Sequence, residues 1–351
     1  MSSVVISGDT SGAITLAAPT VAGTNTITLP ATTGTMALTT GQIGMKNRII
    51  NGNMVIDQRN AGAAVTTSSS YVTDRFAQAF ANASCSFQQV SDAPTGFINS
   101  LKLTVTAGSA PSVGTNNVIL QKIEGLNVTD FGLGTANALT FTLSFWVKGS
   151  VTGTYAVSFT NSAFNRSYVA TYTINSANTW EQKSVTIAGD TSGTWLTTNG
   201  IGLQAIWDFG SGTNLNTTAG SWQAGNYYRT SACTTIASTT NATLQITGVQ
   251  LEVGSAATTF DFRSYGTELA LCQRYYYAPA ISTGIFGGLY NNTSNGMVVV
   301  PHKVTMRAAP TITYTIGTGS LNGTYLTADQ SIVYIATNTP YLSAFTASIE
   351  L

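Results

Sequence analysis

The sequence predicts an all-β protein built around a central β-sandwich of the jelly-roll kind. Residues 141–147 alternate between apolar and small polar side chains, which is the period-two pattern of a strand with one buried face. Further short segments of this kind follow, separated by turn residues, at 157–159, 168–174, 183–187 and 244–251. Only 8% of the 351 residues are charged, so Thr, Ser, Asn, Gln and Gly must cover the surface. These residue types favour strands and turns over long helices.

The chain exceeds the roughly 250–300 residues at which one core stops growing, which predicts several parts. We expect an N-terminal strand-repeat anchor at 1–44, the sandwich at 45–263, a connecting helix at 264–277 and a small C-terminal β domain at 278–351. The anchor contains a near-repeat of a short strand followed by Pro and Gly-Thr, at 13–16 and 26–29. Such a small number of apolar residues cannot bury a core. This segment should therefore pair with copies of itself or with another protein. A flexible leader is the alternative.

The connecting helix begins after a capping residue, Ser264 or Thr267, and carries an apolar stripe at Leu269, Cys272 and Tyr276. This stripe either lines a threefold axis between copies or packs beneath its own domain. The C-terminal domain should hold strands at 297–300, 311–316, 331–335 and 345–349, after a Gly- and Asn-rich loop at 284–296. About 70 residues is small for an isolated domain, which favours support from neighbouring chains.

Charge and cysteine content exclude several classes of partner and cofactor. Basic and acidic residues number 14 each, so no clustered cations are available for nucleic acid. No stretch approaches the roughly 20 apolar residues of a membrane span, and residues 1–4 do not open a secretory signal. Cys85, Cys233 and Cys272 are far apart and the only histidine, His302, is expected at the surface, so we predict no metal and no cofactor. The three thiols should be buried, and a Cys85–Cys233 disulfide stays open.

Several short motifs follow one another along the chain, at 7–12 through 35–38, 47–59, 71–76, 119–124, 249–254, 260–261, 272–276 and 306–311. Their order resembles that of bacteriophage tail-fibre and related virion proteins. The resemblance implies a homotrimeric virion fibre, docked on other tail or baseplate proteins through residues 1–44 and contacting a host surface glycan or protein nearer its C-terminus. Assembly in the host cytoplasm would fit the absence of a secretory signal. The resemblance leaves the organelle open, so a purely structural capsid or neck decoration protein is an alternative.

Several charges fall within otherwise uncharged strands, and buried charges require partners. We expect structural ion pairs such as Arg75 with Glu124 or Arg263 with Asp261.

We predict no catalytic residues. Gly-Asp-Thr-Ser-Gly occurs at 8–12 and 189–193, but the third residue is Ser where aspartic proteases want Gly, and Asx-turns explain both copies. A glycosidase needs two carboxylates beside a cleft, and only Glu181 and Asp208 are left as candidates. A glycan-degrading tailspike is therefore the third functional hypothesis, after an adhesive protein and a structural protein.

Aromatic residues suggest a non-catalytic glycan site, because sugar C–H faces stack on aromatic rings while amides bond their hydroxyls. The candidate positions are Trp207, Trp222, Tyr227 and Tyr228 in the sandwich, and Tyr290, Asn291 and Asn292 in the predicted C-terminal loop. A packed core is the alternative for the first group. Trp146, inside a strand, is expected to belong to the core.

Overall fold

The computed structural model of the protein describes residues 3–7, 13–17, 45–281, 284–292, 295–337 and 339–351. The contacts divide the chain into two units, 1–42 and 43–351. In the first unit, β1 (Ser3–Ser7) and β2 (Ala13–Ala17) form an antiparallel pair, and β2 coincides with the first copy of the near-repeat. The second copy at 26–29, the rest of 18–44 and the first Gly-Asp-Thr-Ser-Gly element lie outside the described residues.

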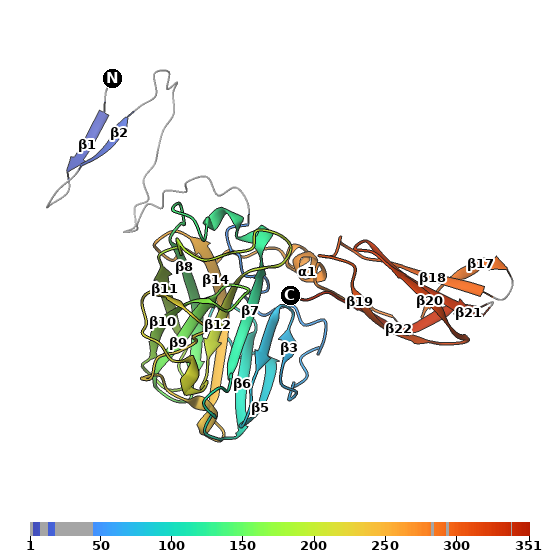
Figure 1. The fold of residues 1–351 in the computed structure, drawn as a ribbon, viewed down its shortest axis with the longest axis horizontal. Helices are drawn as coiled ribbons and strands as arrows, with labels where there is room; N and C mark the ends of the chain where they lie inside the picture. Colours follow the sequence, from blue (N-terminus) through green and yellow to red (C-terminus); the bar gives the residue numbers. More distant parts are fainter. Residues whose placement is uncertain (1–2, 8–12, 18–44, 282–283, 293–294, 338) are drawn as a thin grey trace. The chain divides into compact units, whose positions relative to one another are not determined.

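The second unit contains the predicted β-sandwich, made of two antiparallel sheets (Figure 1). The seven-stranded sheet has the order β13–β10–β9–β12–β7–β4–β3: Trp222–Ala224, Arg166–Ile174, Gly153–Thr160, Ile201–Asp208, Val118–Glu124, Phe76–Ala79 and Ser70–Thr73. The five-stranded sheet has the order β11–β8–β14–β6–β5: Glu181–Ile187, Phe141–Gly149, Thr243–Val253, Ser100–Ala107 and Ser84–Val90. Short 3-10 helices lie in the connections: η1 (Gly125–Asn127), η2 (Thr129–Phe131), η3 (Thr213–Leu215) and η4 (Ile236–Ser238). The all-β prediction is confirmed.

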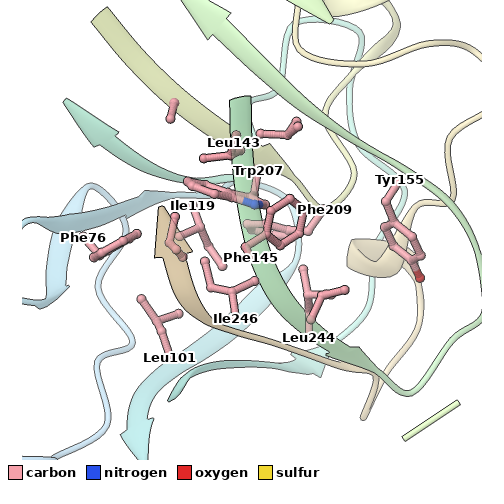
Figure 2. Packing of buried hydrophobic residues seen from close by; sticks show 14 of the residues in the cluster. Phe76, Leu101, Ile119, Leu143, Phe145, Tyr155, Trp207, Phe209, Leu244 and Ile246 are labelled. Carbon is pink, nitrogen blue, oxygen red and sulfur yellow. The ribbon is translucent and has the colours of Figure 1, made fainter. Parts of the chain in front are cut away.

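The sandwich core forms between the two sheets because alternate residues of each strand point inward. Phe145 of β8 and Trp207 of β12 face each other across the sheets, with ring centroids 5.8 Å apart in an edge-to-face arrangement. Both side chains are fully buried. Figure 2 shows Trp207 surrounded by aliphatic and aromatic side chains from both sheets. Trp207 therefore supplies core packing, which overturns its prediction as a sugar platform.

The connecting segment contains one α-helix, α1 (Tyr265–Gln273), whose first turn is capped by the Ser264 hydroxyl accepting from the Thr267 N–H. Leu269 and Cys272 pack with Ile50 and Ile56 of the same chain, and Cys272 is completely buried. The predicted apolar stripe is therefore satisfied within one chain. The proposal that Cys272 lines a threefold axis is wrong.

The C-terminal region consists of two four-stranded sheets with a shared apolar core. In one sheet, β22 (Tyr341–Ser348) pairs with β15 (Tyr276–Tyr277), β16 (Ile285–Phe286) and β19 (Thr311–Ile316). The other has the order β17 (Gly288–Asn292), β18 (Asn295–Pro301), β21 (Gln330–Ala336) and β20 (Ser320–Leu326). The predicted loop at 284–296 is wrong, because most of its described residues pair as strands.

Several buried charges form ion pairs, but not all of them as predicted. Arg75 binds Glu350, and Glu124 instead accepts hydrogen bonds from Arg274 and Tyr275. Arg263 lies 3.7 Å from Asp261, as predicted, and also contacts Glu268.

The three cysteines are buried and free, which confirms the prediction of buried thiols. Cys85 and Cys233 form no disulfide. His302 is half-buried rather than at the surface, because its ring contacts the Ala328 carbonyl and the Ser331 hydroxyl. Among the described residues, no group of three or more His, Cys, Asp or Glu side chains is placed to hold a metal ion. In the same parts of the chain, no helix has the length and apolarity needed to cross a bilayer.

Candidate binding groove

A groove of about 580 Å³ lies on the outer face of the five-stranded sheet. Its floor is formed by β8 and β11, and its walls come from two connections, 91–99 between β5 and β6 and 254–264 between β14 and α1. The volume lies within the range of small-ligand sites. The side chains that matter for its chemistry are Phe97, Trp146, Gln182, Ser184, Phe260 and Phe262.

Trp146 points into this groove because of its position in the alternation of β8. Phe145 and Val147 belong to the sandwich core, so the residue between them must face the opposite side of the sheet. Trp146 is half-buried and lines the groove, which corrects its assignment to the core. The signal was present in the sequence, because residues 141, 143, 145 and 147 already defined the inward face.

Three phenylalanines form an aromatic cluster beside Trp146. Phe97 comes from the first wall, while Phe260 and Phe262 come from the second, and their ring centroids lie 4.8–5.3 Å apart. Phe262 keeps 57% of its surface exposed, although it is a large apolar side chain. Exposed apolar surface gathered in a concave site is typical of binding sites rather than of folding requirements.

Gly248 allows the first wall and the floor to meet. It lies at a break in the register between β14 and β8 and has a φ of +59°, which glycine adopts at little cost. A Cβ at this position would lie 2.7 Å from Cζ of Phe97 and 2.9 Å from Cδ1 of Trp146. The glycine therefore gives the two rings the space to pack directly against the backbone.

The outer face that surrounds these rings is polar and carries many hydrogen-bonding groups. Gln182 and Ser184 of β11 are exposed on the floor beside Trp146. On the neighbouring strands the residues that point away from the core include Thr142, Ser144, Lys148, Gln245, Thr247, Gln250 and Glu252. Aromatic surface next to amides and hydroxyls is the combination that sugar recognition requires.

Polar side chains fasten both walls to the sheet. Gln250 donates to the Thr259 carbonyl at 3.3 Å and accepts from the Asp261 N–H at 2.7 Å, which holds the second wall. Asp92 holds the first wall by accepting from Lys148 and from Gln245. The hydrogen bond from Lys148 keeps the pKa of Asp92 below its usual range, despite some loss of hydration.

No acidic side chain is among the residues that line the groove in the described structure. The two carboxylates considered for catalysis, Glu181 and Asp208, lie on different sheets. Desolvation opposes ionisation of Glu181, but hydrogen bonds from Lys183, Ser176 and Asn175 lower its pKa to about 2. Burial raises the pKa of Asp208, whose carboxylate lies 3.4 Å from Arg229. These two groups do not form a pair that flanks a sugar bond.

The aromatic positions predicted in the sandwich contribute mainly to packing. Tyr228 is buried with Ile206 and Leu215, so it cannot stack on a sugar. Trp222 is half-buried, donates from Nε1 to the Ala188 carbonyl at 2.7 Å and packs on Trp195. Tyr227 is half-buried against a small cluster. None of these residues lines the groove. For Tyr290, Asn291 and Asn292 only the backbone, in β17, is described.

No protein-family model matches this sequence, and no curated protein is significantly similar to it. Similar solved structures include the enzymatically active domain of tailspike protein 4 of bacteriophage CBA120, at 16% identity and a TM-score of 0.31. That match covers 60% of this chain and 22% of the tailspike chain. Two carbohydrate-binding modules of Clostridium thermocellum, family 11 of Lic26A-Cel5E and the C-terminal family 22 module of Xyn10B, have 11% and 9% identity and TM-scores of 0.29 and 0.30. They cover 56% and 57% of this chain and 99% of their own. Similarities of this strength do not assign a function to this chain.

Proposed function

We propose that this protein is a non-catalytic glycan-binding protein whose ligand lies in the groove over β8 and β11. The observation that carries the proposal is the outward position of Trp146 between two walls that add three further aromatic rings. A sugar ring placed on the Trp146 indole would present its C–H face to the aromatic surface. Its hydroxyls would then lie near the Gln182 amide and the Ser184 hydroxyl.

The electrostatics of the groove favour a neutral ligand. Lys183 is the one charged residue among the lining residues of the described structure, and its ammonium is bound to Glu181 at 2.6 Å. An anionic sugar would therefore find no unpaired cation in the lining. The absence of a lining carboxylate in the described structure supports binding without hydrolysis, because glycosidases use two such groups.

The test is binding of neutral oligosaccharides on a glycan array, followed by calorimetry with the strongest binder. Truncation of a central aromatic anchor costs about 2 kcal/mol, so Trp146→Ala should weaken binding by a factor of about 30. The matched control is Phe164→Ala, which removes another partly exposed aromatic side chain that is not among the groove residues. Equal loss in both variants, or no loss in either, would reject the groove, and release of reducing sugar would reject the non-catalytic mechanism.

The biological setting that we propose is a phage virion, with this chain as a homotrimeric tail fibre or receptor-binding protein. The order of the short motifs and the nearly uncharged, hydroxyl-rich composition support it. Several weak sites on one particle gain avidity of roughly 10²–10⁴-fold, so modest single-site affinity would suffice for host attachment. Electron microscopy of virions labelled in the C-terminal domain tests this role, because a label on the capsid or neck would instead support a decoration protein.

A further inference from the structure

The groove over β8 and β11 differs in chemistry on the two sides of Trp146. Trp146 lies on β8, with β11 on one side of it and β14 on the other. On the β11 side its in-register neighbour is Gln182, which lines the groove and is exposed, as is Ser184 further along that strand. Both side chains can form hydrogen bonds with the hydroxyls of a sugar. The β11 side of the groove is therefore polar and accessible.

On the β14 side the polar side chains of the sheet already have partners. Thr247, the neighbour of Trp146 on β14, is completely buried and donates from its hydroxyl to the Asn99 carbonyl at 2.7 Å. Gln250, the next outward-facing residue of β14, is also completely buried, and its amide oxygen accepts from the Asp261 N–H at 2.7 Å. Neither side chain is accessible to a ligand.

Three phenylalanines border Trp146 on this side instead. A Cβ on Gly248 of β14 would lie 2.7 Å from Cζ of Phe97 and 2.9 Å from Cδ1 of Trp146, so Phe97 adjoins the edge of the indole. Phe260 packs edge-on against both Phe97 and Phe262, with interplanar angles of 76° and 69°. Phenyl rings carry no conventional hydrogen-bonding group, so this cluster offers a ligand apolar contact.

We infer that the bound sugar carries a substituent that ends in a methyl group, and that Phe97, Phe260 and Phe262 bind this group. This inference rests on the proposed function, because it assumes a sugar ring on Trp146. Substituents project from the edge of a pyranose ring, so one of them is directed towards the phenylalanines. A hydroxyl placed there would leave water without gaining a partner, whereas a methyl group gains from its burial.

Neutral acetamido, O-acetyl and 6-deoxy sugars all present such a methyl group. The walls favour the two acetyl-bearing classes, because Thr95 and Thr259 also line the groove and are exposed. In the chain, each of these threonines lies within two residues of a phenylalanine of the cluster. Their hydroxyls can donate to the carbonyl oxygen of an acetyl group while its methyl group packs on the rings. A 6-deoxy sugar would use the apolar contact alone.

A glycan array of matched neutral pairs, probed with the full chain, tests the inference. Chitotriose against cellotriose compares an acetamido group with a hydroxyl on the same backbone. O-acetylated xylotriose against xylotriose tests the O-acetyl class, and α-L-rhamnosides against α-L-mannosides test the 6-deoxy class. One methyl group in an apolar pocket changes affinity by roughly tenfold or more, so we expect about a tenfold preference for the methyl-bearing member of at least one pair.

The array separates failure of this inference from failure of the proposed function. Binding of these glycans with no preference in any pair would overturn the inference and leave the proposed glycan site standing. Absence of binding to every neutral glycan on the array would reject both.

Phe262→Ser tests whether the phenylalanine cluster causes the preference. Phe262 is 57% exposed, so the variant should fold, which far-UV circular dichroism checks. We expect it to lose most of the preference while it still binds the hydroxyl-bearing member of the pair. Trp146→Ala should instead weaken both members by the same factor and keep their ratio. Phe164→Ser, at a partly exposed phenylalanine outside the groove lining, is the control and should change neither affinity. An unchanged ratio in Phe262→Ser would overturn the inference.

Discussion

The carboxylate of Glu252 accepts two hydrogen bonds from Thr258, one from its backbone N–H at 2.9 Å and one from its hydroxyl at 2.6 Å. Glu252 is buried on the outer face of β14, and Thr258 belongs to the wall that carries Phe260 and Phe262. Lys46 also reaches this junction, since its ammonium donates to the Thr259 carbonyl at 2.8 Å. The position of the aromatic wall is therefore set by a buried charge that never touches the groove.

Replacing Glu252 by Ala should loosen this wall. Hydrogen bonds to a charged group contribute about 1.5–3 kcal/mol each, and their loss frees residues 258–262 to move. We expect affinity for a neutral oligosaccharide to fall about tenfold in calorimetry while the chain stays folded. Lys102→Ala is the control. Lys102 lies on β6 and points to the same outer face of the sheet as Glu252, and its replacement should leave affinity unchanged. Unchanged affinity in Glu252→Ala would show that the wall does not contribute.

Gly248→Ala tests whether the close packing of Phe97 and Trp146 matters for binding. The added Cβ would lie within 3 Å of both rings, and alanine is also strained at a φ of +59°. We expect oligosaccharide affinity to fall by at least tenfold, accompanied by a change in tryptophan fluorescence. Gly254→Ala is the matched control, because it shares a positive φ but has no atom near its Cβ position. Similar losses of affinity in both variants would assign the effect to backbone strain alone.

Strand alternation made the fold and the faces of individual strands predictable. The sequence pattern around Phe145 is sufficient to place Trp146 outside the core, and the same rule places Trp207 inside with Leu203 and Ala205. Alternation does not reveal which outward positions remain accessible. Ser158 faces away from the core of the sandwich, yet it is completely buried beneath other parts of the chain.

Contacts between distant parts of the chain could not be predicted from local patterns. Arg75 was expected to bind Glu124, which lies on β7 next to β4, but it binds Glu350, 275 residues away. The two walls of the groove are likewise separated by more than 150 residues. Charge spacing along the sequence indicates that partners are needed, but it cannot decide among several available carboxylates.

Glu350→Ala should destabilise the second unit strongly. Its carboxylate binds both Arg59, at 2.6 Å, and the fully buried Arg75. Removing it leaves Arg75 with Tyr275 and a backbone carbonyl as partners, and losing one member of a buried pair costs about 3–5 kcal/mol. Denaturant titration measures this loss. Asp130→Ala is the control: Asp130 is half-exposed and pairs with Arg48, so we expect at most about 1 kcal/mol there. Equal losses of unfolding free energy in the two variants would mean that the Arg75–Glu350 pair contributes no more to stability than an exposed ion pair.

The buried carboxyl group of Asp74 should make the free energy of unfolding depend on pH, and the direction of this dependence can be derived. Burial raises its pKa to about 6, although Gln58 donates hydrogen bonds to it from its backbone and its side chain. In the unfolded chain the pKa of an aspartate is about 3.9, so between pH 4 and 6 the folded protein binds more protons at this site than the unfolded chain. The contribution of Asp74 to the free energy of unfolding is therefore greatest below pH 4 and is lost as pH rises through 6. The difference of about two units between the pKa of Asp74 in the folded chain and in the unfolded chain corresponds to at most about 3 kcal/mol of unfolding free energy.

Denaturant titrations at pH 4.5 and 7 should show the wild type losing stability relative to Asp74→Asn as pH rises, because the asparagine cannot ionise. A difference between the two proteins that does not change with pH, or that changes in the opposite direction, would show that hydrogen bonding from Gln58 outweighs desolvation.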